Sequence, residues 1–376
     1  MATIVKKAGS GGASPPSGPV IKATSATTSI NEVEDENSLV GAETIITAEV
    51  DAAASELVGI GNRGFRADSD LLYADSGGLK SWNCIKIAEH VLETTGKLTR
   101  VVYADLGGYE DMKNAAEGGL IQLFNLGQTA SPVAALQKLA RGEWPVRGSD
   151  GVVDFKPFAE NGGPEIGCYV FDSLTATADM LMQELVAKGQ RTGQDVVARF
   201  SYFGETFGSP SQSHYGTVQS MMKRFITVAS NLPVNRVIYT ALEGKGQDEQ
   251  TKATVLGPKV IGQAMTDAMG PMIGNTFHLQ AVAVDGGTKI EYRCYFRPHP
   301  HPTLPLTYPA KVRLDEGLDE WNKLHPEGYF LVGKEQPGEP SVASFLEFRE
   351  HLAKQKVQKL KDKVAAARAR FSTKEK

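Results

Sequence analysis

The sequence predicts an α/β fold, with a mainly parallel β-sheet that is flanked by helices and ends in antiparallel strands. Two observations lead to this prediction. Apolar runs of four or five residues alternate with segments of helical periodicity, which is typical of parallel strands joined by crossover helices. In the last third of the chain, two apolar runs flank the sequence Asp285-Gly286-Gly287-Thr288, which indicates a β-hairpin.

The predicted elements follow one another in a regular order. Strands are expected at the apolar runs 71–73, 101–104, 168–171, 237–240, 277–284 and 289–296, with residues 310–313 on or near the last of them. Helices are expected where apolar residues recur every three or four positions. One ends before Gly96, one runs from Leu174 to just before Gly189, and one spans about 214–230.

Composition limits the classes of protein that the chain can belong to. Of its 376 residues, 41% are hydrophobic, which suffices for one large core or two modest ones. The net charge is −4, so the molecule as a whole has no excess of positive charge that would indicate nucleic-acid binding. A basic patch could still lie within that balance. The three cysteines, Cys84, Cys168 and Cys294, form no C-x-x-C pair, which argues against a zinc knuckle and fits a reducing compartment.

The chain is expected to be soluble and cytoplasmic. Residues 1–7 are followed by Gly, Ser and Pro, so we expect no signal peptide. No window reaches the roughly 18 apolar residues that a membrane span needs. We therefore expect no membrane partner.

Three regions are expected along the chain. Residues 1–40 are rich in Ser, Thr, Ala, Gly and Pro and should form a disordered N-terminal arm. Residues 41–335 should form the main domain. Residues 336–376 should form a basic helical tail, because positions 341–376 hold ten Lys and Arg against four Asp and Glu, a balance of 10 − 4 = +6.

A glycine-rich turn lies between the first predicted strand and its helix. The segment Ala74-Asp75-Ser76-Gly77-Gly78-Leu79-Lys80-Ser81 places a lysine and a hydroxyl where a triphosphate loop needs them. Both glycines of the pattern G-x-x-x-x-G-K-[ST] are replaced, by Ala74 and by Leu79, and Leu79 should put a side chain where the backbone normally closes on phosphate. The alternative is a glycine turn between a strand and an amphipathic helix.

A carboxylate follows the third predicted strand. Asp172 comes directly after the apolar run 168–171 and about ninety residues after Lys80, where it could hold the water shell of magnesium. The alternative is a helix cap, since Asp172 precedes a helix and aspartate is a favoured N-cap.

Together these segments resemble the RecA-type ATPases encoded by bacteriophages, which are related to recombination ATPases of the RecA, RadA and KaiC kind. The resemblance covers roughly two thirds of the chain and rests on five segments in a matching order. They are 72–81, 102–109, 169–175, 237–243 and 308–313.

The resemblance implies a RecA-like P-loop nucleotide-binding domain at 41–335 that binds ATP and Mg²⁺. It implies a homo-oligomer that acts in phage DNA recombination, repair or replication, with single-stranded DNA as a partner, in the host cytoplasm. Ser81 and Asp172 are the implied metal ligands. The implied nucleotide contacts are Asp75, Ser76, Gly77, Gly78, Leu79, Lys80, Ser81 and Trp82, although Trp82 is equally interpreted as a core or surface anchor.

RecA-like enzymes place a catalytic glutamate just after the second strand. The closest candidates here are Asp105 and Glu110, while Gly107 occupies the expected place of that glutamate. The alternative for Asp105 is a turn cap. Thr240 and Glu243 close the fourth strand, where the family senses the γ-phosphate. The loop 244–258 that follows is similar in position to the loop that touches DNA in recombinases.

Two further cations lie beyond the core. Lys311 and Arg313 alternate on one predicted strand, which points both side chains the same way. The resemblance implies that such a pair reaches the γ-phosphate of a neighbouring subunit, as an arginine finger does. The alternative is a pair of solvated charges on an edge strand.

A different class of function remains open. A vestigial P-loop protein with a structural role in a phage particle or its assembly would also fit the N-terminal arm, the basic tail and the altered loop. A small-molecule phosphotransferase lacks a visible acceptor motif. His299 and His301 could suggest a metal, but the prolines around them favour an extended loop.

Overall fold

The structure is a computed structural model of the full chain. It describes residues 67–105, 109–149, 153–192, 196–202, 205–247, 254–313, 317–334 and 336–372. The predicted N-terminal arm at 1–40 and the position of Gly107 lie outside the described residues.

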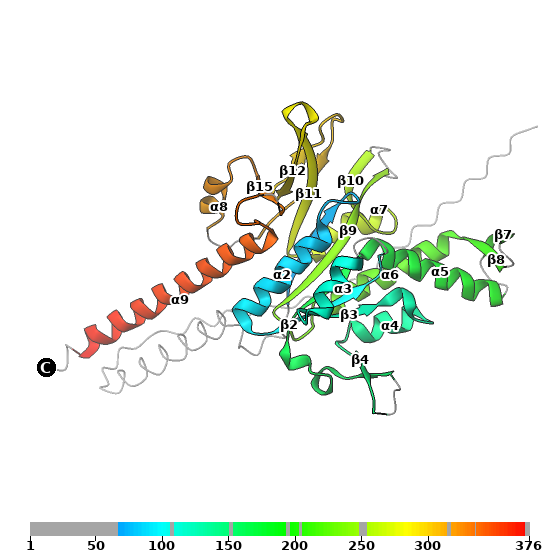
Figure 1. The fold of residues 1–376 in the computed structure, drawn as a ribbon, viewed down its shortest axis with the longest axis horizontal. Coiled ribbons are helices and arrows are strands. Elements are labelled where there is room, and N and C mark those ends of the chain that lie inside the picture. The colour runs from blue at the N-terminus through cyan, green and yellow to red at the C-terminus, as the bar shows by residue number, and fades with distance from the viewer. Residues whose placement is uncertain are drawn as a thin grey trace, which may run out of the picture. The chain divides into compact units, whose positions relative to one another are not determined.

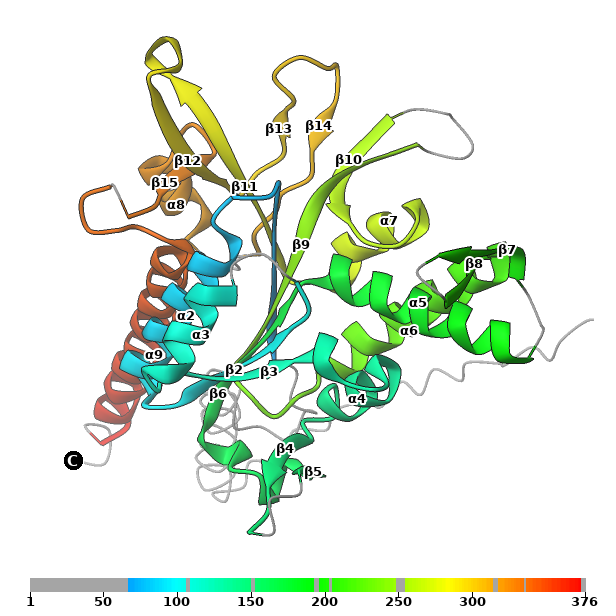
Figure 2. The same ribbon diagram turned by 45° about the vertical axis from the view of Figure 1, so that its right-hand side comes forward.

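A mixed sheet forms the centre of the described chain (Figures 1 and 2). Six of its strands are parallel neighbours in the order β11-β1-β9-β6-β2-β3. They are β1 (Asp68–Ala74), β2 (Leu98–Tyr103), β3 (Ile121–Asn125), β6 (Ile166–Asp172), β9 (Arg236–Gln247) and β11 (Asn275–Val284). The strand that carries Asp172 is therefore separated from the loop strand β1 by β9.

Antiparallel strands extend the sheet near the C-terminal end of the chain. The strands β12 (Lys289–Tyr295) and β15 (Tyr329–Val332) continue it beyond β11, and β10 (Thr254–Lys259) pairs with β9. The predicted hairpin at 285–288 joins β11 and β12 through the turn η4 (Asp285–Gly287). The predicted fold class, a mainly parallel sheet with helices and C-terminal antiparallel strands, is confirmed.

Helices cover both faces of the sheet, as Figure 2 shows. One face carries α2 (Lys80–Thr95), α3 (Tyr109–Glu117), α8 (Leu318–Leu324) and α9 (Val342–Ser372). The other face carries α4 (Pro132–Leu139), α5 (Leu174–Thr192), α6 (Gln212–Ala229) and α7 (Gln263–Met272). Alternate residues of one strand face opposite sides, so Leu71 and Tyr73 belong to the α5–α7 core and Leu72 to the α2 core. Burial on both faces explains why the parallel strands have continuous apolar runs.

Smaller elements occupy the connections. Three short hairpins pair β4 (Trp144–Arg147) with β5 (Val153–Lys156), β7 (Val196–Tyr202) with β8 (Glu205–Pro210), and β13 (His299–Pro300) with β14 (Thr307–Tyr308). Single 3₁₀ turns are η1 (Leu126–Gln128), η2 (Phe158–Glu160) and η3 (Gly163–Glu165).

Two predicted segments differ from the structure. The expected loop at 244–258 is largely a hairpin, because β9 continues to Gln247 and pairs with β10. Gly244 lies so close to Lys259 that an added Cβ would be 2.7 Å from the lysine Cβ, so the glycine permits strand pairing there. The expected strand at 310–313 is a single bridge between Lys311 and Thr276 beside β11.

A buried polar network fixes the strands at their amino ends. Asp70 of β1 forms an ion pair with Arg236 of β9, and it accepts a hydrogen bond of 2.6 Å from the amide of Asn275 in β11. All three side chains are buried. Because removal of one partner would leave an uncompensated charge in the core, such a pair specifies the register of the three neighbouring strands.

The first turns of the predicted tail belong to the core. Val342, Phe345 and Leu346 are buried in the same cluster as α2, and α9 lies beside α2 in both ribbon views (Figures 1 and 2). The carboxylate of Glu350 lies 3.0 Å from Nε2 of His90 on α2. Residues further along α9 are half-buried or exposed up to residue 365.

Within the described ranges, no helix combines the length and the apolarity that crossing a membrane requires. The three cysteines are reduced and buried in the core, where burial raises the pKa of each thiol.

Candidate functional site

The loop between β1 and α2 is shaped by its two internal glycines. Gly77 has a φ of +80°, in the left-handed region that side chains disfavour. A Cβ added to Gly78 would lie 2.4 Å from Cβ of Ala74, so only glycine fits there. The loop is therefore a tight turn in the absence of the consensus glycines, while Asp75 and Ser76 are exposed at its tip.

Leu79 has a backbone conformation that glycine adopts more readily than leucine. Its φ of 59° and ψ of 22° are left-handed, and it is the N-cap residue of α2. The sequence suggested that its side chain would lie where the backbone closes on phosphate. Instead the side chain packs on the core towards Gly333, where an added Cβ would lie 3.5 Å from Cδ1 of Leu79.

The loop between β1 and α2 holds the side chain of Lys80 in place. Its side chain is buried, with a relative exposure of 8%. The ammonium donates hydrogen bonds of 3.1 Å to the carbonyl of Ala74 and 2.9 Å to that of Asp75. Burial lowers the pKa of the ammonium, although the nearby carboxylates of Asp172 and Asp105 act to raise it. Lys80 is thus held at the loop, close enough to Asp172 and Asp105 for their charges to act on its pKa.

Asp172 lies at the end of β6 and faces Ser81. The hydroxyl of Ser81 donates a hydrogen bond of 2.9 Å to Oδ2, and the hydroxyl of Thr240 donates to Oδ1. The alternative in which Asp172 caps α5 is not what the structure shows, because Oγ of Ser173 accepts from the N–H of Ala176, at 3.3 Å. The carboxylate points into the site instead.

The environment of Asp172 fits a cation. The residue is 2% exposed, and burial raises the pKa of the carboxyl despite hydrogen bonds from two hydroxyls. Its neighbour Lys80 donates to backbone carbonyls. Burying a carboxylate without a bonded cation lowers the stability of the fold, and a divalent metal would compensate the negative charge. Asp172 with Ser81 provides the oxygen ligands that Mg²⁺ prefers beside phosphate.

The two carboxylates proposed for catalysis lie in different surroundings. Asp105 follows β2, is half-buried, and acts electrostatically on both Lys80 and Asp172. Glu110 is exposed in the first turn of α3, where a negative charge favours the helix dipole. The structure therefore brings Asp105, and not Glu110, towards the phosphate loop.

Glu243 belongs to a second polar cluster at the carboxyl ends of the strands. It accepts a hydrogen bond of 2.6 Å from the hydroxyl of Tyr308, and its other oxygen lies 2.9 Å from Nε2 of His278. Burial acts to raise the pKa of this carboxyl, but the hydrogen bonds from His278 and Tyr308 outweigh it and lower the pKa. Glu243 is thus held as a carboxylate. Because β9 residues alternate in direction, it faces the opposite side from Thr240.

The cluster extends to the hairpin β13–β14. Nδ1 of His278 lies 3.1 Å from Nε2 of His299, while Nδ1 of His299 is buried without a partner in the described chain. Burial lowers the pKa of His299 to about 4, so it is neutral. His278 is 0% exposed and stacks on Tyr73, two residues before the loop begins at Asp75. His278 and Tyr308 were not predicted as site residues: His278 lies in an apolar strand run, and in the segment 308–313 only Lys311 and Arg313 were given a role.

Lys311 and Arg313 do not reach the loop of their own chain. The ammonium of Lys311 donates to the carbonyl of Gly270 in α7, and the side chain of Arg313 is exposed. The N–H of Arg313 donates to Asn275, which pairs with Asp70, four positions before the end of β1. This is about 13 Å from the loop, at 3.3 Å per residue.

Trp82 packs in the core beside α2 and is buried. Its ring therefore anchors α2 in the core. Only the backbone N–H of Trp82, in the first turn of α2, faces the end of the helix where phosphate would lie.

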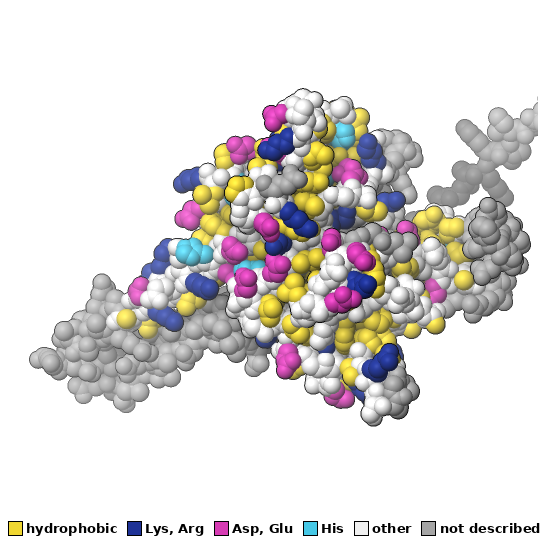
Figure 3. All heavy atoms as spheres, viewed as in Figure 1, with side chains coloured by type: hydrophobic (Ala, Val, Ile, Leu, Met, Phe, Trp, Pro, Cys, Tyr) yellow, Lys and Arg dark blue, Asp and Glu magenta, His cyan; other side chains and the backbone are white. Residues whose placement is uncertain are grey.

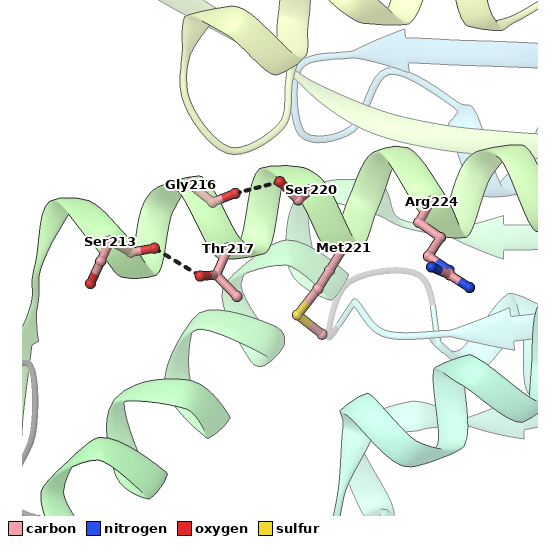
Figure 4. Close-up of a pocket in the computed structure, with 6 residues that line it drawn as sticks. All are labelled: Ser213, Gly216, Thr217, Ser220, Met221 and Arg224. Atoms are coloured by element: carbon pink, nitrogen blue, oxygen red, sulfur yellow. Dashed lines mark hydrogen bonds between the residues drawn. The ribbon is translucent and has the colours of Figure 1, made fainter.

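A surface hollow of about 460 Å³ lies on α6, away from the loop (Figure 4). Its hydroxyls are already engaged, because Thr217 and Ser220 donate to the carbonyls of Ser213 and Gly216 in the same helix. Apart from the guanidinium of Arg224, the hollow brings together no charged side chains, and the convergence of Lys80, Ser81 and Asp172 is the better candidate site.

Comparisons with known proteins find remote similarity. No protein-family model and no curated protein matches the chain. The structure is similar to a KaiC-like protein from the archaeon Pyrococcus horikoshii OT3, with 10% identity and a TM-score of 0.34, over 71% of this chain and 90% of that one. It is also similar to a RadB recombinase, with 14% identity and a TM-score of 0.35, over 68% and 90%. Similarities this remote carry no argument about function.

Proposed function

We propose that the chain is a RecA-like P-loop protein that binds ATP with Mg²⁺ and hydrolyses it as a homo-oligomer. The observation that supports this most directly is the convergence of Lys80, Ser81 and Asp172 at the carboxyl ends of β1 and β6. The lysine would hold the β- and γ-phosphates, and the first N–H groups of α2 would add donors. Bound Mg²⁺ would neutralise charge that develops on the phosphates.

Asp105 is the carboxylate best placed to act on an attacking water. It follows β2, next to the strand of Asp172, and it is electrostatically coupled to Lys80. We propose that Asp105 orients this water. Thr240 would hold Asp172 in place through its hydroxyl.

Asp172→Asn should abolish the magnesium dependence of nucleotide binding while leaving the apo protein at least as stable. The amide has the same shape but no charge for the metal. Because burial raises the pKa of the native carboxyl, the ionised form costs stability at neutral pH, so its removal should stabilise the fold by on the order of 1 kcal/mol. Titration of ATP with and without Mg²⁺, together with thermal unfolding, measures both effects. Unchanged magnesium dependence would reduce Asp172 to a structural role.

We further propose that the protein acts on single-stranded DNA in phage recombination, repair or replication. The outer part of α9 supports this, since Lys354, Lys359, Lys361 and Lys363 are exposed there beside Asp362. Basic side chains recur along this helix in the space-filling view (Figure 3).

Neutralising Lys359, Lys361 and Lys363 to Gln should weaken binding of single-stranded DNA and flatten its salt dependence. Each lost phosphate contact lowers the slope by about 0.7 for a single strand. This substitution is preferable to deletion of the tail, because the first turns of α9 are core. A matched control removes three exposed cations elsewhere, at Arg141, Arg147 and Lys289. Equal slopes for the two triple variants would contradict a role for α9.

A structural role in a phage particle is the second candidate. The left-handed Leu79 in place of a glycine favours it, because a protein that only holds nucleotide tolerates an altered loop. ATP turnover measured with and without single-stranded DNA separates the two functions: stimulation by DNA supports the enzyme. Stable association with particle proteins, without turnover, supports the structural role.

A further inference from the structure

Leu79 pairs an unfavourable backbone conformation with a well-packed side chain. A left-handed φ of 59° is strained for a leucine, whereas the glycine usual at this place adopts it freely. Its side chain is partly buried against the core cluster of α2. At Gly333, which has a φ of +131°, an added Cβ would lie 3.5 Å from Cδ1 of Leu79 and 3.7 Å from Cδ2 of Tyr292. Leu79 therefore reaches the backbone after β15, beside the ring of Tyr292 on β12.

Asn83 makes a second connection between the same parts of the chain. Its amide donates a hydrogen bond of 2.9 Å to the carbonyl of Leu79, and its oxygen accepts one of 2.9 Å from the N–H of Val342. Asn83 is fully buried, and Val342 is the first residue of α9. One side chain thus joins the residue that ends the loop to the start of the C-terminal helix.

We propose that Leu79 is a positioning residue that makes nucleotide affinity depend on how β12, β15 and the start of α9 pack against the end of the loop. The proposal rests on the proposed function, because it concerns the same loop. The left-handed residue turns the chain from the loop into α2, and so it sets the direction of the first N–H groups of the helix. Packing of its side chain against the apolar cluster of α2, in the surroundings of Gly333 that it shares with Tyr292, offsets the strain that this conformation costs a leucine. A glycine would need no such support.

A double-mutant cycle between Leu79→Gly and Tyr292→Ala tests the proposal through the affinity for ATP–Mg²⁺. In the wild-type background, Tyr292→Ala should weaken binding by up to about five- to thirtyfold, which corresponds to the free energy that a left-handed conformation costs one residue with a side chain. In the Leu79→Gly background, the same substitution should change affinity less than about twofold, because glycine has no side chain that needs support from the packing around Gly333. Equal losses in both backgrounds would overturn the proposal, since Tyr292 would then act on folding alone.

Two further variants distinguish this coupling from a general effect of altered packing on affinity. Leu79→Met keeps volume and apolarity, so it should retain the dependence on Tyr292. Ile290→Ala, on the same strand as Tyr292 but exposed, should leave affinity unchanged in both backgrounds. Thermal unfolding of each variant shows that the protein compared is folded.

Hydrogen exchange of residues 75–82 provides a readout that needs no nucleotide. Tyr292→Ala should speed exchange of these loop amides in the wild-type background and leave it unchanged in Leu79→Gly. If ATP does not bind even to the wild type, the proposed function fails while the exchange cycle still decides on the coupling. If ATP binds and the exchange effects are equal in both backgrounds, the coupling fails and the proposed function stands.

Discussion

Lys80→Ala should abolish detectable binding of ATP–Mg²⁺ in a calorimetric titration that shows clear binding by the wild type. The ammonium is the one cation that the loop itself carries, and it supplies the point charge for the β- and γ-phosphates. In the structure it is held within the loop by the carbonyls of Ala74 and Asp75. A phosphate would take over these hydrogen bonds without a large movement of the side chain.

The loss should be one of binding and not of folding. Burial lowers the pKa of Lys80, so its charged form already costs stability, and alanine removes that cost. Lys223→Ala is the control. Lys223 is an exposed lysine on α6, outside the loop and away from the C-terminal segments that pack on α2. Equal affinity of Lys80→Ala and the wild type would remove the P-loop assignment.

Arg313→Ala should reduce ATP turnover about 10³-fold or more if it acts as a finger across a subunit interface. The structure places Arg313 exposed and far from the loop of its own chain, so any contact with a γ-phosphate has to come from a neighbour. Lys311 is less free to move, because its ammonium is bonded to Gly270. Mixing inactive Arg313→Ala protein with inactive Lys80→Ala protein should restore activity at about a quarter of randomly formed interfaces.

The control for the mixing experiment is a chain with both substitutions. Mixed with Lys80→Ala protein, this double variant offers no interface with an intact loop, so no activity should return. Full turnover by Arg313→Ala protein as a separate monomer would exclude a role in trans.

The fold was predictable because its signals are local. The strands at 71–73, 101–104, 168–171 and 237–240 are apolar runs bounded by turn residues, and each falls on an observed parallel strand, with only Ala104 beyond the end of β2. The hairpin turn at 285–288 was likewise readable from its glycines. β10 was missed because the loop at 244–258 was expected from the resemblance alone, whereas Gly244 permits close pairing of β9 with β10.

The site was predictable only in part, since its contacts join distant segments. Lys80 and Ser81 were found from one motif, but the hydrogen bond from Thr240 to Asp172 spans 68 residues and leaves no local signal. The direction of the Leu79 side chain depends on Gly333, which comes over 250 residues later. The roles of Asp105, Glu243 and Lys311 stay predictions.

The cluster around Glu243 has a definite polarity. A neutral His278 ring that donated from Nδ1 to His299 would turn an unprotonated Nε2 towards the Glu243 carboxylate, 2.9 Å away, which is unfavourable. In the reverse order, Nε2 of His299 donates to Nδ1 of His278, and Nε2 of His278 donates to the carboxylate. The hydrogen bonds therefore run one way, from the hairpin β13–β14 through β11 to β9. Their dipoles add along the chain, so a shift of that hairpin changes the field at Glu243, beside the phosphate loop.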